Sequence, residues 1–193
     1  MSDNVGKTTM AQEVTRETLD NNVGISKRKS RKLPKSVRPE EFKELIKATP
    51  EKDKGARVAF LLAYASGMRI SEVLRCSPEH FRPNSIFIPE SKYGVERVVP
   101  LPKGWRQEFI KLLPLKTTDR TLERKFKKYA KKAGLNQSYT FHSLRHGFAT
   151  RLVESGVPIN QVQLALGHSN ISTTSIYTKA SPQDLLKSYE ELF

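Results

Sequence analysis

The sequence predicts a mainly α-helical domain with one small antiparallel β-hairpin or sheet. From residue 39 onward, apolar residues recur at helical spacing, and proline, acidic or hydroxyl residues stand where helices would begin. Two runs that are rich in β-branched residues, 85–88 and 95–100, flank Ser91–Gly94 and predict a hairpin with Lys92 at or near its turn. Apolar residues make up 37% of the 193, which suits one globular domain with a core.

The expected helices follow one another along the chain. The first begins at Pro39, because a proline followed by two acidic residues is typical of the first turn of a helix. The second passes through Val58 and ends near Gly67, and a short third helix begins at Ser71. Beyond the hairpin, apolar spacing predicts helices over about 104–113, 118–132, 141–154, 158–166 and 171–178, and an amphipathic segment from Pro182 to Phe193.

Residues 1–36 differ from the rest of the chain. Residues 1–25 are polar and lack aromatic side chains, so we expect a flexible polar arm. Basic residues follow this arm. One interpretation of them is an ordinary run of charge that solvent surrounds. The other, which we favour, is an extended linker that lies on phosphate groups, formed by Lys27, Arg28, Lys29, Arg31, Lys32 and Lys35. We therefore expect an arm and linker over 1–36 and one domain over 37–193, with a tail helix over 181–193.

The charge balance is the first indication of a partner. The chain has 34 Lys and Arg against 20 Asp and Glu, a formal net charge of +14, which favours a polyanion such as nucleic acid. Ribosomal, chromatin and membrane-surface proteins share this property. The single cysteine, Cys76, excludes an internal disulfide and a multi-cysteine zinc site, and we expect it to be buried after a helix. Without a membrane-spanning apolar run or a secretory signal pattern, we expect the chain in the cytoplasm, or at a host nucleoid if a virus or plasmid encodes it.

Six residues together supply the parts of a phosphoryl-transfer site: Arg69, Lys92, His142, Arg145, His168 and Tyr177. Transfer of a phosphoryl group to a protein side chain builds negative charge on the phosphate oxygens, and arginines such as Arg69 and Arg145 can hold that charge through paired donors. Lys92 can donate a proton to the leaving 5′ oxygen, and Tyr177 can attack phosphorus once its hydroxyl is deprotonated. A tyrosine nucleophile conserves the energy of the broken bond, so rejoining needs no ATP.

Each of these residues is commonplace by itself. Tyr177 alone would be a partly buried aromatic residue, and Arg69 or Arg145 alone would be a surface arginine or a salt-bridge partner. His142 and His146, four residues apart, could share a zinc ion on one face of a helix, but no acidic residue lies near them in sequence to complete such a site. We expect no metal and no other cofactor.

The local contexts of these residues resemble one protein family. The resemblance rests on Gly67–Leu74, Lys92–Leu101, His142–Thr150, Leu166–Ser169 and Ile176–Thr178. These segments are similar to motifs of the tyrosine recombinases, the lambda-integrase and Xer-type family. The resemblance implies the tyrosine recombinase catalytic-domain fold over 37–193 and a site-specific recombinase or integrase that cleaves and rejoins double-stranded DNA through a 3′-phosphotyrosyl intermediate. It also implies a homo-oligomer on DNA, expected to be a tetrameric synapse, and no metal.

The resemblance implies a role for each matching residue. Arg69 and Arg145 would clamp the scissile phosphate, while Glu72 orients Arg69 or a neighbouring histidine. His142 would assist proton transfer with Tyr177. Lys92 would be the general acid. His168 would donate a hydrogen bond to the transition state.

Two features depart from the family pattern. Tyr93 occupies a hairpin position where a small residue or glycine is common. Family members usually carry a helical core-binding domain before the catalytic domain, whereas only the arm and linker precede Pro39 here. We therefore expect DNA cleavage with weak binding and poor assembly. Two alternatives remain, a type IB topoisomerase that relaxes DNA and a DNA-binding regulator without catalysis.

Overall fold

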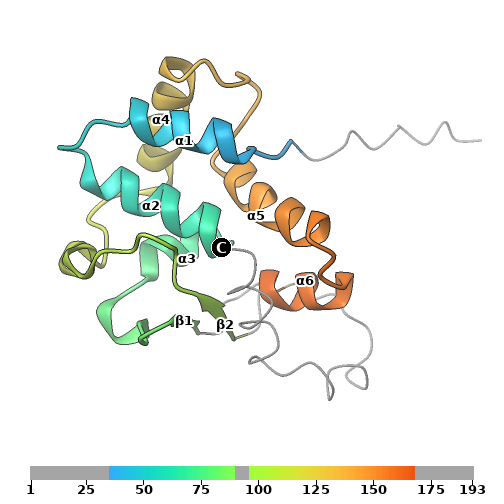
Figure 1. The fold of residues 1–193 in the computed structure, drawn as a ribbon. Helices are drawn as coiled ribbons and strands as arrows, with labels where there is room; N and C mark the ends of the chain where they lie inside the picture. Colours follow the sequence, from blue (N-terminus) through green and yellow to red (C-terminus); the bar gives the residue numbers. More distant parts are fainter. Residues whose placement is uncertain (1–34, 90–95, 168–193) are drawn as a thin grey trace, which may run out of the picture. The chain divides into compact units, whose positions relative to one another are not determined.

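The computed structural model describes residues 35–89 and 96–167, all within one compact unit, Pro34–Phe193. In the described part, six α-helices, two 3-10 helices and two strands follow one another (Figure 1). Their order is α1 (Pro39–Ala48), α2 (Lys54–Ala65), α3 (Ile70–Arg75), η1 (Pro78–His80), β1 (Ser85–Ile88), β2 (Arg97–Pro100), η2 (Gln107–Leu112), α4 (Asp119–Lys132), α5 (His142–Glu154) and α6 (Ile159–Leu166). None of the helices described is long and apolar enough to cross a membrane.

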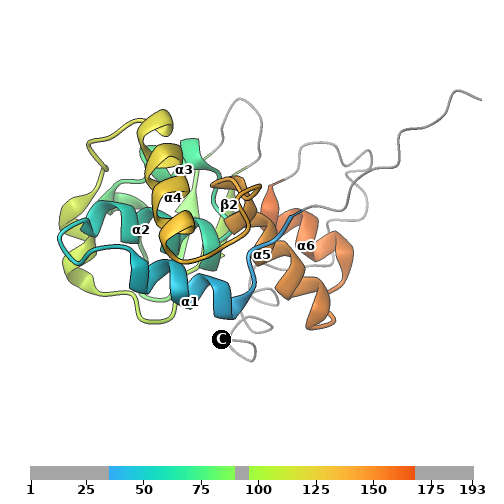
Figure 2. The ribbon, with the colours of Figure 1, turned by 90° about the horizontal axis from the view of Figure 1, so that it is seen from above.

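Helix α2 is the centre of the main core. Its N-cap residue, Asp53, accepts a hydrogen bond from the Ala56 amide, and the helix then buries most of its residues and packs against α1, α3, α4 and α5. The ring of Phe60 meets those of Phe126 from α4 and Phe141 from the start of α5, with centroid distances of 5.8 and 6.0 Å. Figures 1 and 2 show α2 with its neighbouring helices around it.

The hairpin is a two-stranded antiparallel sheet. Ser85 pairs with Pro100 and Ile88 with Arg97, which fixes the register. Burial alternates along both strands, so that Arg97 and Val99 of β2 face inward. A charged side chain therefore occupies a core-facing position at the start of β2.

Helices α5 and α6 complete the domain by packing against α2 and β2. Helix α5 packs on α2 at Gly147, where an added Cβ would lie 2.4 Å from the Val37 carbonyl oxygen and 2.9 Å from the Tyr64 ring. Helix α6 packs on both α5 and β2. Its C-cap residue is Gly167, whose φ of 61° is the left-handed conformation that glycine adopts without strain.

The structure confirms the predicted fold class of a mainly α-helical domain with a small antiparallel sheet. Helix α1 begins at Pro39 and β1 covers Ser85–Ile88, both as expected. Cys76 is buried directly after α3, also as expected. The expected tail helix over 181–193 and the helix over 171–178 lie outside the described residues, and the boundary at residue 36 stays a prediction.

The helix expected over 104–113 is present, but it is shorter than expected and of the 3-10 type. The structure has a 3-10 helix there, Gln107–Leu112. The segment is short, and Pro114 directly after Leu113 cannot donate a hydrogen bond that would continue a helix. Just before this segment, the Trp105 ring stacks against the Phe81 ring, with centroids 4.9 Å apart.

Candidate functional site

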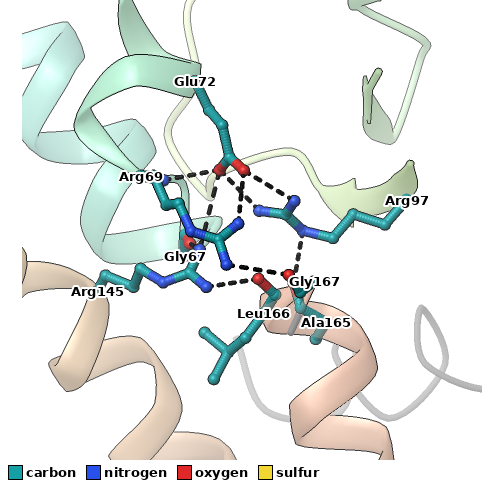
Figure 3. Close-up of polar contacts among 8 residues, drawn as sticks. All are labelled: Gly67, Arg69, Glu72, Arg97, Arg145, Ala165, Leu166 and Gly167. Carbon is teal, nitrogen blue, oxygen red and sulfur yellow. Dashed lines mark hydrogen bonds and ion pairs between the residues drawn. The ribbon is translucent and has the colours of Figure 1, made fainter. Parts of the chain in front are cut away.

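Four charged side chains from three separate segments meet at one point of the domain (Figure 3). Arg69 and Glu72 come from the start of α3, Arg97 from the start of β2 and Arg145 from the second turn of α5. We call these four residues the arginine cluster. It lies against the last residues of α6, whose backbone carbonyl groups accept hydrogen bonds from it.

Arg69 and Glu72 are held together by the start of α3. The turn before the helix contains Gly67 at a φ of 64°, and a Cβ there would come within 2.5 Å of the Phe148 ring. Arg69 is the N-cap residue, and its amide donates to Glu72 Oε2 at 2.7 Å while its Nη1 donates to Oε1 at 2.9 Å. An acidic residue in the first turn is also favoured by the helix dipole. The local sequence therefore fixes this pair.

Arg97 is the main ionic partner of Glu72. Its Nη1 donates to Glu72 Oε1 at 3.0 Å and its Nη2 to Oε2 at 2.8 Å, and both side chains are only 2% exposed. Its Nε donates to the Ala165 carbonyl at 2.9 Å. Sequence reasoning missed this residue. The available signal was a charged residue on the inward face of an alternating strand, which requires a buried partner.

Arg145 is buried and connects α5 to the turn before α3 and to the end of α6. Its Nη1 donates to the Gly67 carbonyl at 2.6 Å, its Nη2 donates to the Leu166 carbonyl, and the same Nη1 lies 3.8 Å from Glu72 Oε2. Arg69 adds a bond from Nη2 to the Gly167 carbonyl at 3.0 Å. Arg69 and Arg145, 76 positions apart in the sequence, are thus brought together at Leu166 and Gly167, the last residue of α6 and its C-cap.

The arginine cluster carries an excess of positive charge, with three guanidinium groups and one carboxylate. Burial by itself raises the pKa of Glu72, but hydrogen bonds and charge from Arg97, followed by Arg69, hold it at about 2. Burial, with repulsion from Arg69 and Arg97, lowers the pKa of Arg145 to about 9. The Arg69 side chain remains 22% exposed, so an anion from solvent can reach the cluster at Arg69. An anion there would relieve the repulsion, and phosphate geometry suits paired arginines.

The predicted site residues are only partly within the described structure. Arg69, Arg145 and Glu72 lie in the arginine cluster, whereas His142 is exposed at the first residue of α5. Lys92, His168 and Tyr177 lie outside the described residues, as do the linker residues Lys27, Arg28, Lys29, Arg31 and Lys32. The last linker residue, Lys35, is described and exposed.

The two histidines at the start of α5 lie beside each other. The rings of His142 and His146 meet edge to face, with centroids 4.6 Å apart. Burial, and then the charge of Arg145, lowers the pKa of His146. Across residues 35–89 and 96–167, no group of three or more histidine, cysteine, aspartate or glutamate residues is placed to hold a metal ion.

Comparison with known proteins identifies a matching family model. Residues 35–184 match the phage integrase family. A curated relative, tyrosine recombinase XerA of Thermococcus onnurineus, is 36% identical over 179 residues, which cover 82% of this chain and 63% of that protein. The chain thus spans less than two thirds of the length of the relatives that it matches.

Solved structures share the fold. The integrase from mycobacterium phage Brujita matches with a TM-score of 0.68 at 24% identity, over 86% of this chain and 60% of that one. The XerH site-specific recombinase bound to a palindromic difH substrate matches with a TM-score of 0.58 at 25% identity, over 83% of this chain and 53% of that one.

Proposed function

The chain belongs to the phage integrase family, and from this premise we propose that it is a tyrosine site-specific recombinase. It cleaves and rejoins DNA strands through a 3′-phosphotyrosyl intermediate on Tyr177. The curated relatives are named tyrosine recombinases, which supports the reaction class. The observation that carries the proposal is the arginine cluster, where Arg69 and Arg145 meet at the end of α6.

The arginine cluster has the properties that a phosphodiester site requires. Attack on phosphorus adds negative charge to the non-bridging oxygens, and guanidinium groups that are already fixed stabilise this charge without reorganising. Glu72, the Gly67 carbonyl group and the carbonyl groups at the end of α6 hold Arg69 and Arg145 in place. The site is therefore preorganised for a phosphate anion.

The proposed reaction balances without an added cofactor. The Tyr177 oxygen attacks phosphorus and loses its proton with assistance from His142, and the bond from phosphorus to the 5′ oxygen breaks. Lys92 donates a proton to that 5′ oxygen, while Arg69, Arg145 and His168 stabilise the transition state. Rejoining is the reverse reaction, in which a 5′ hydroxyl displaces the tyrosine.

The proposed partner is double-stranded DNA. The net charge of +14 favours a polyanion, and the linker residues Lys27, Arg28, Lys29, Arg31, Lys32 and Lys35 would contact phosphate groups. Complete exchange between two duplexes cuts four strands, and each cut uses one tyrosine. We therefore propose a homotetramer on DNA, acting in the cytoplasm or at the nucleoid.

Trapping of the covalent intermediate tests the proposal. A duplex with a nick just beyond the cleavage position loses its short 5′-hydroxyl fragment after cleavage, so the phosphotyrosyl adduct accumulates. We expect the chain to form a protein–DNA adduct that survives denaturation and Tyr177→Phe to form none. Tyr139→Phe is the matched control, because the Tyr139 hydroxyl only contacts Glu41, at 3.2 Å. An adduct with Tyr177→Phe, or none with the parent over a randomised set of DNA sites, would contradict the proposal.

A further inference from the structure

We propose that Arg97 is a positioning residue that neutralises Glu72, so that Arg69 and Arg145 keep their positive charge for the incoming anion. The inference rests on the proposed function only in taking that anion to be a DNA phosphodiester. Arg97 itself would not touch the DNA, since its side chain is 2% exposed and all three of its nitrogen atoms have partners within the domain.

Arg97 is the main hydrogen-bond and ionic partner of the Glu72 carboxylate. Arg97 donates to both carboxylate oxygens in a forked arrangement, at 3.0 and 2.8 Å. The side chain of Arg69 donates to one oxygen, and Arg145 lies 3.8 Å away, beyond hydrogen-bond distance. Arg69 and Arg145 are therefore close enough to Glu72 to be oriented by it, while the charge of Glu72 is offset chiefly by Arg97.

Loss of Arg97 would change the charge that the anion meets. Without it, one buried carboxylate would face only Arg69 and Arg145, and its strongest attraction would be to these two guanidinium groups. The excess of two positive charges in the cluster would fall to one. Glu72 would then compete directly with a phosphate for the same donors.

Arg97 also supports the end of α6. Its Nε donates to the Ala165 carbonyl, and an added Cβ at Gly167 would lie 2.7 Å from its Nη1. The carbonyl groups of Leu166 and Gly167, next to it, are the acceptors for Arg145 and Arg69. A loss of function in an Arg97 variant could thus arise from lost charge or from a displaced helix end, and the test must separate the two.

Four variants make that separation: Arg97→Gln, Arg97→Lys, Glu72→Gln and the double variant with Gln at both positions. Arg97→Gln leaves the carboxylate without its main partner. The double variant removes the carboxylate charge as well, although it does not restore the bonds of Arg97 to α6. If charge is the cause, the second substitution rescues the first, which is the result that a double-mutant cycle detects.

The first readout is the shift in melting temperature caused by inorganic sulfate, compared with sodium chloride at equal ionic strength. Sulfate is a tetrahedral oxyanion, and any ligand that binds the native state raises its melting temperature. We expect Arg97→Gln to lose most of the sulfate-specific shift, and the double variant to regain it. Arg97→Lys should keep part of the sulfate-specific shift in melting temperature. Lysine retains the positive charge but cannot donate to both carboxylate oxygens of Glu72 in the forked arrangement. Arg57→Gln is the control, since Arg57 binds the Thr49 and Ile46 carbonyl groups at the other end of α2.

The second readout is the rate of adduct formation on the nicked duplex. We expect Arg97→Gln to slow it ~100-fold, the size of effect seen when one preorganised charge contact is removed from a catalytic site, and the double variant to recover at least ~tenfold. A sulfate shift in Arg97→Gln equal to that of the parent would overturn the inference, as would a folded double variant no faster than the single one. If the parent forms no adduct but its sulfate shift depends on Arg97, the role of Arg97 stands and the proposed function fails.

Discussion

At the scale of single residues, Glu72 contributes to how the stability of the domain responds to acid. Burial raises its pKa, but Arg97 and then Arg69 more than offset this and hold the pKa at about 2, against an ordinary value of 4.5. A carboxyl group whose pKa is lower in the folded state stabilises the fold at any pH above its unfolded value. That contribution is lost as the pH falls from 4.5 toward about 2.

We therefore predict a loss of stability in acid that depends on Glu72. The difference between 4.5 and about 2 corresponds to about 3 kcal/mol of unfolding free energy. Urea unfolding at pH 7, 5 and 3 measures it, and Glu72→Gln should remove this component of the pH dependence. Glu44→Gln is the control, because Glu44 pairs with Lys47 at the surface. An acid profile of Glu72→Gln that parallels that of the parent would show the assignment to be wrong.

The site residues were predictable to different degrees, for physical reasons. Arg69 and Arg145 have side chains that suit phosphate binding, whereas Glu72 was predicted because its segment, Gly67–Leu74, resembles a family motif. Arg97 lies in a family-like segment as well, but its role depends on the pairing of Ile88 with Arg97 and on the packing of α6 against β2. Neither is visible in a single stretch of sequence.

At the scale of elements, the contact between α5 and α2 depends on the absence of a side chain at Gly147. The Val37 carbonyl and the Tyr64 ring occupy the place where a Cβ would lie. Gly55, in the first turn of α2, differs because the nearest atom to its added Cβ is a Leu115 methyl carbon at 3.8 Å, an ordinary contact. The same change of glycine to alanine therefore has opposite consequences in the two helices.

We predict that Gly147→Ala destabilises the domain by about 1–3 kcal/mol, because the backbone at Val37 must move away from α5. Gly55→Ala should stabilise it by about 0.5–1 kcal/mol, since alanine is the better helix former and meets no clash. Thermal unfolding of both variants measures the difference. Equal effects at the two sites would mean that the close approach at Gly147 does not limit packing.

Element starts were easier to predict than helix types. Pro39 with its acidic neighbours correctly marked the start of α1, because capping preferences act over a few residues. The segment over 104–113 has apolar spacing that an α-helix and a 3-10 helix both satisfy. Its type depends on contacts such as that between Trp105 and Phe81, which are distant in sequence.

At the scale of the whole molecule, the net charge of +14 means that the proposed binding to DNA can be tested through its salt dependence. Each phosphate that a protein cation neutralises contributes about 0.9 to the slope of log affinity against log salt. The linker cations are expected to supply part of this slope.

We predict that replacing Lys27, Arg28, Lys29, Arg31 and Lys32 with glutamine weakens DNA binding and lowers the salt slope by about 0.9 for each phosphate group that is no longer neutralised. Fluorescence anisotropy over a salt series measures both quantities. A variant with the same number of glutamines on α4, at Arg120, Arg124, Lys128, Lys131 and Lys132, is matched in net charge. An equal fall in slope for both variants would show that the linker has no special role.

The arginine cluster also sets the order in which the domain can be completed during synthesis. Arg69 bonds to Gly167, 98 residues later, and Arg145 bonds to Gly67, 78 residues earlier. Closing such long loops is entropically costly until the intervening elements are folded. A nascent chain that ends before α6 contains the arginines but none of the α6 carbonyl groups that hold them. A chain that stops before α6 therefore cannot complete the arginine cluster, which closes only after the last helix described here has been made.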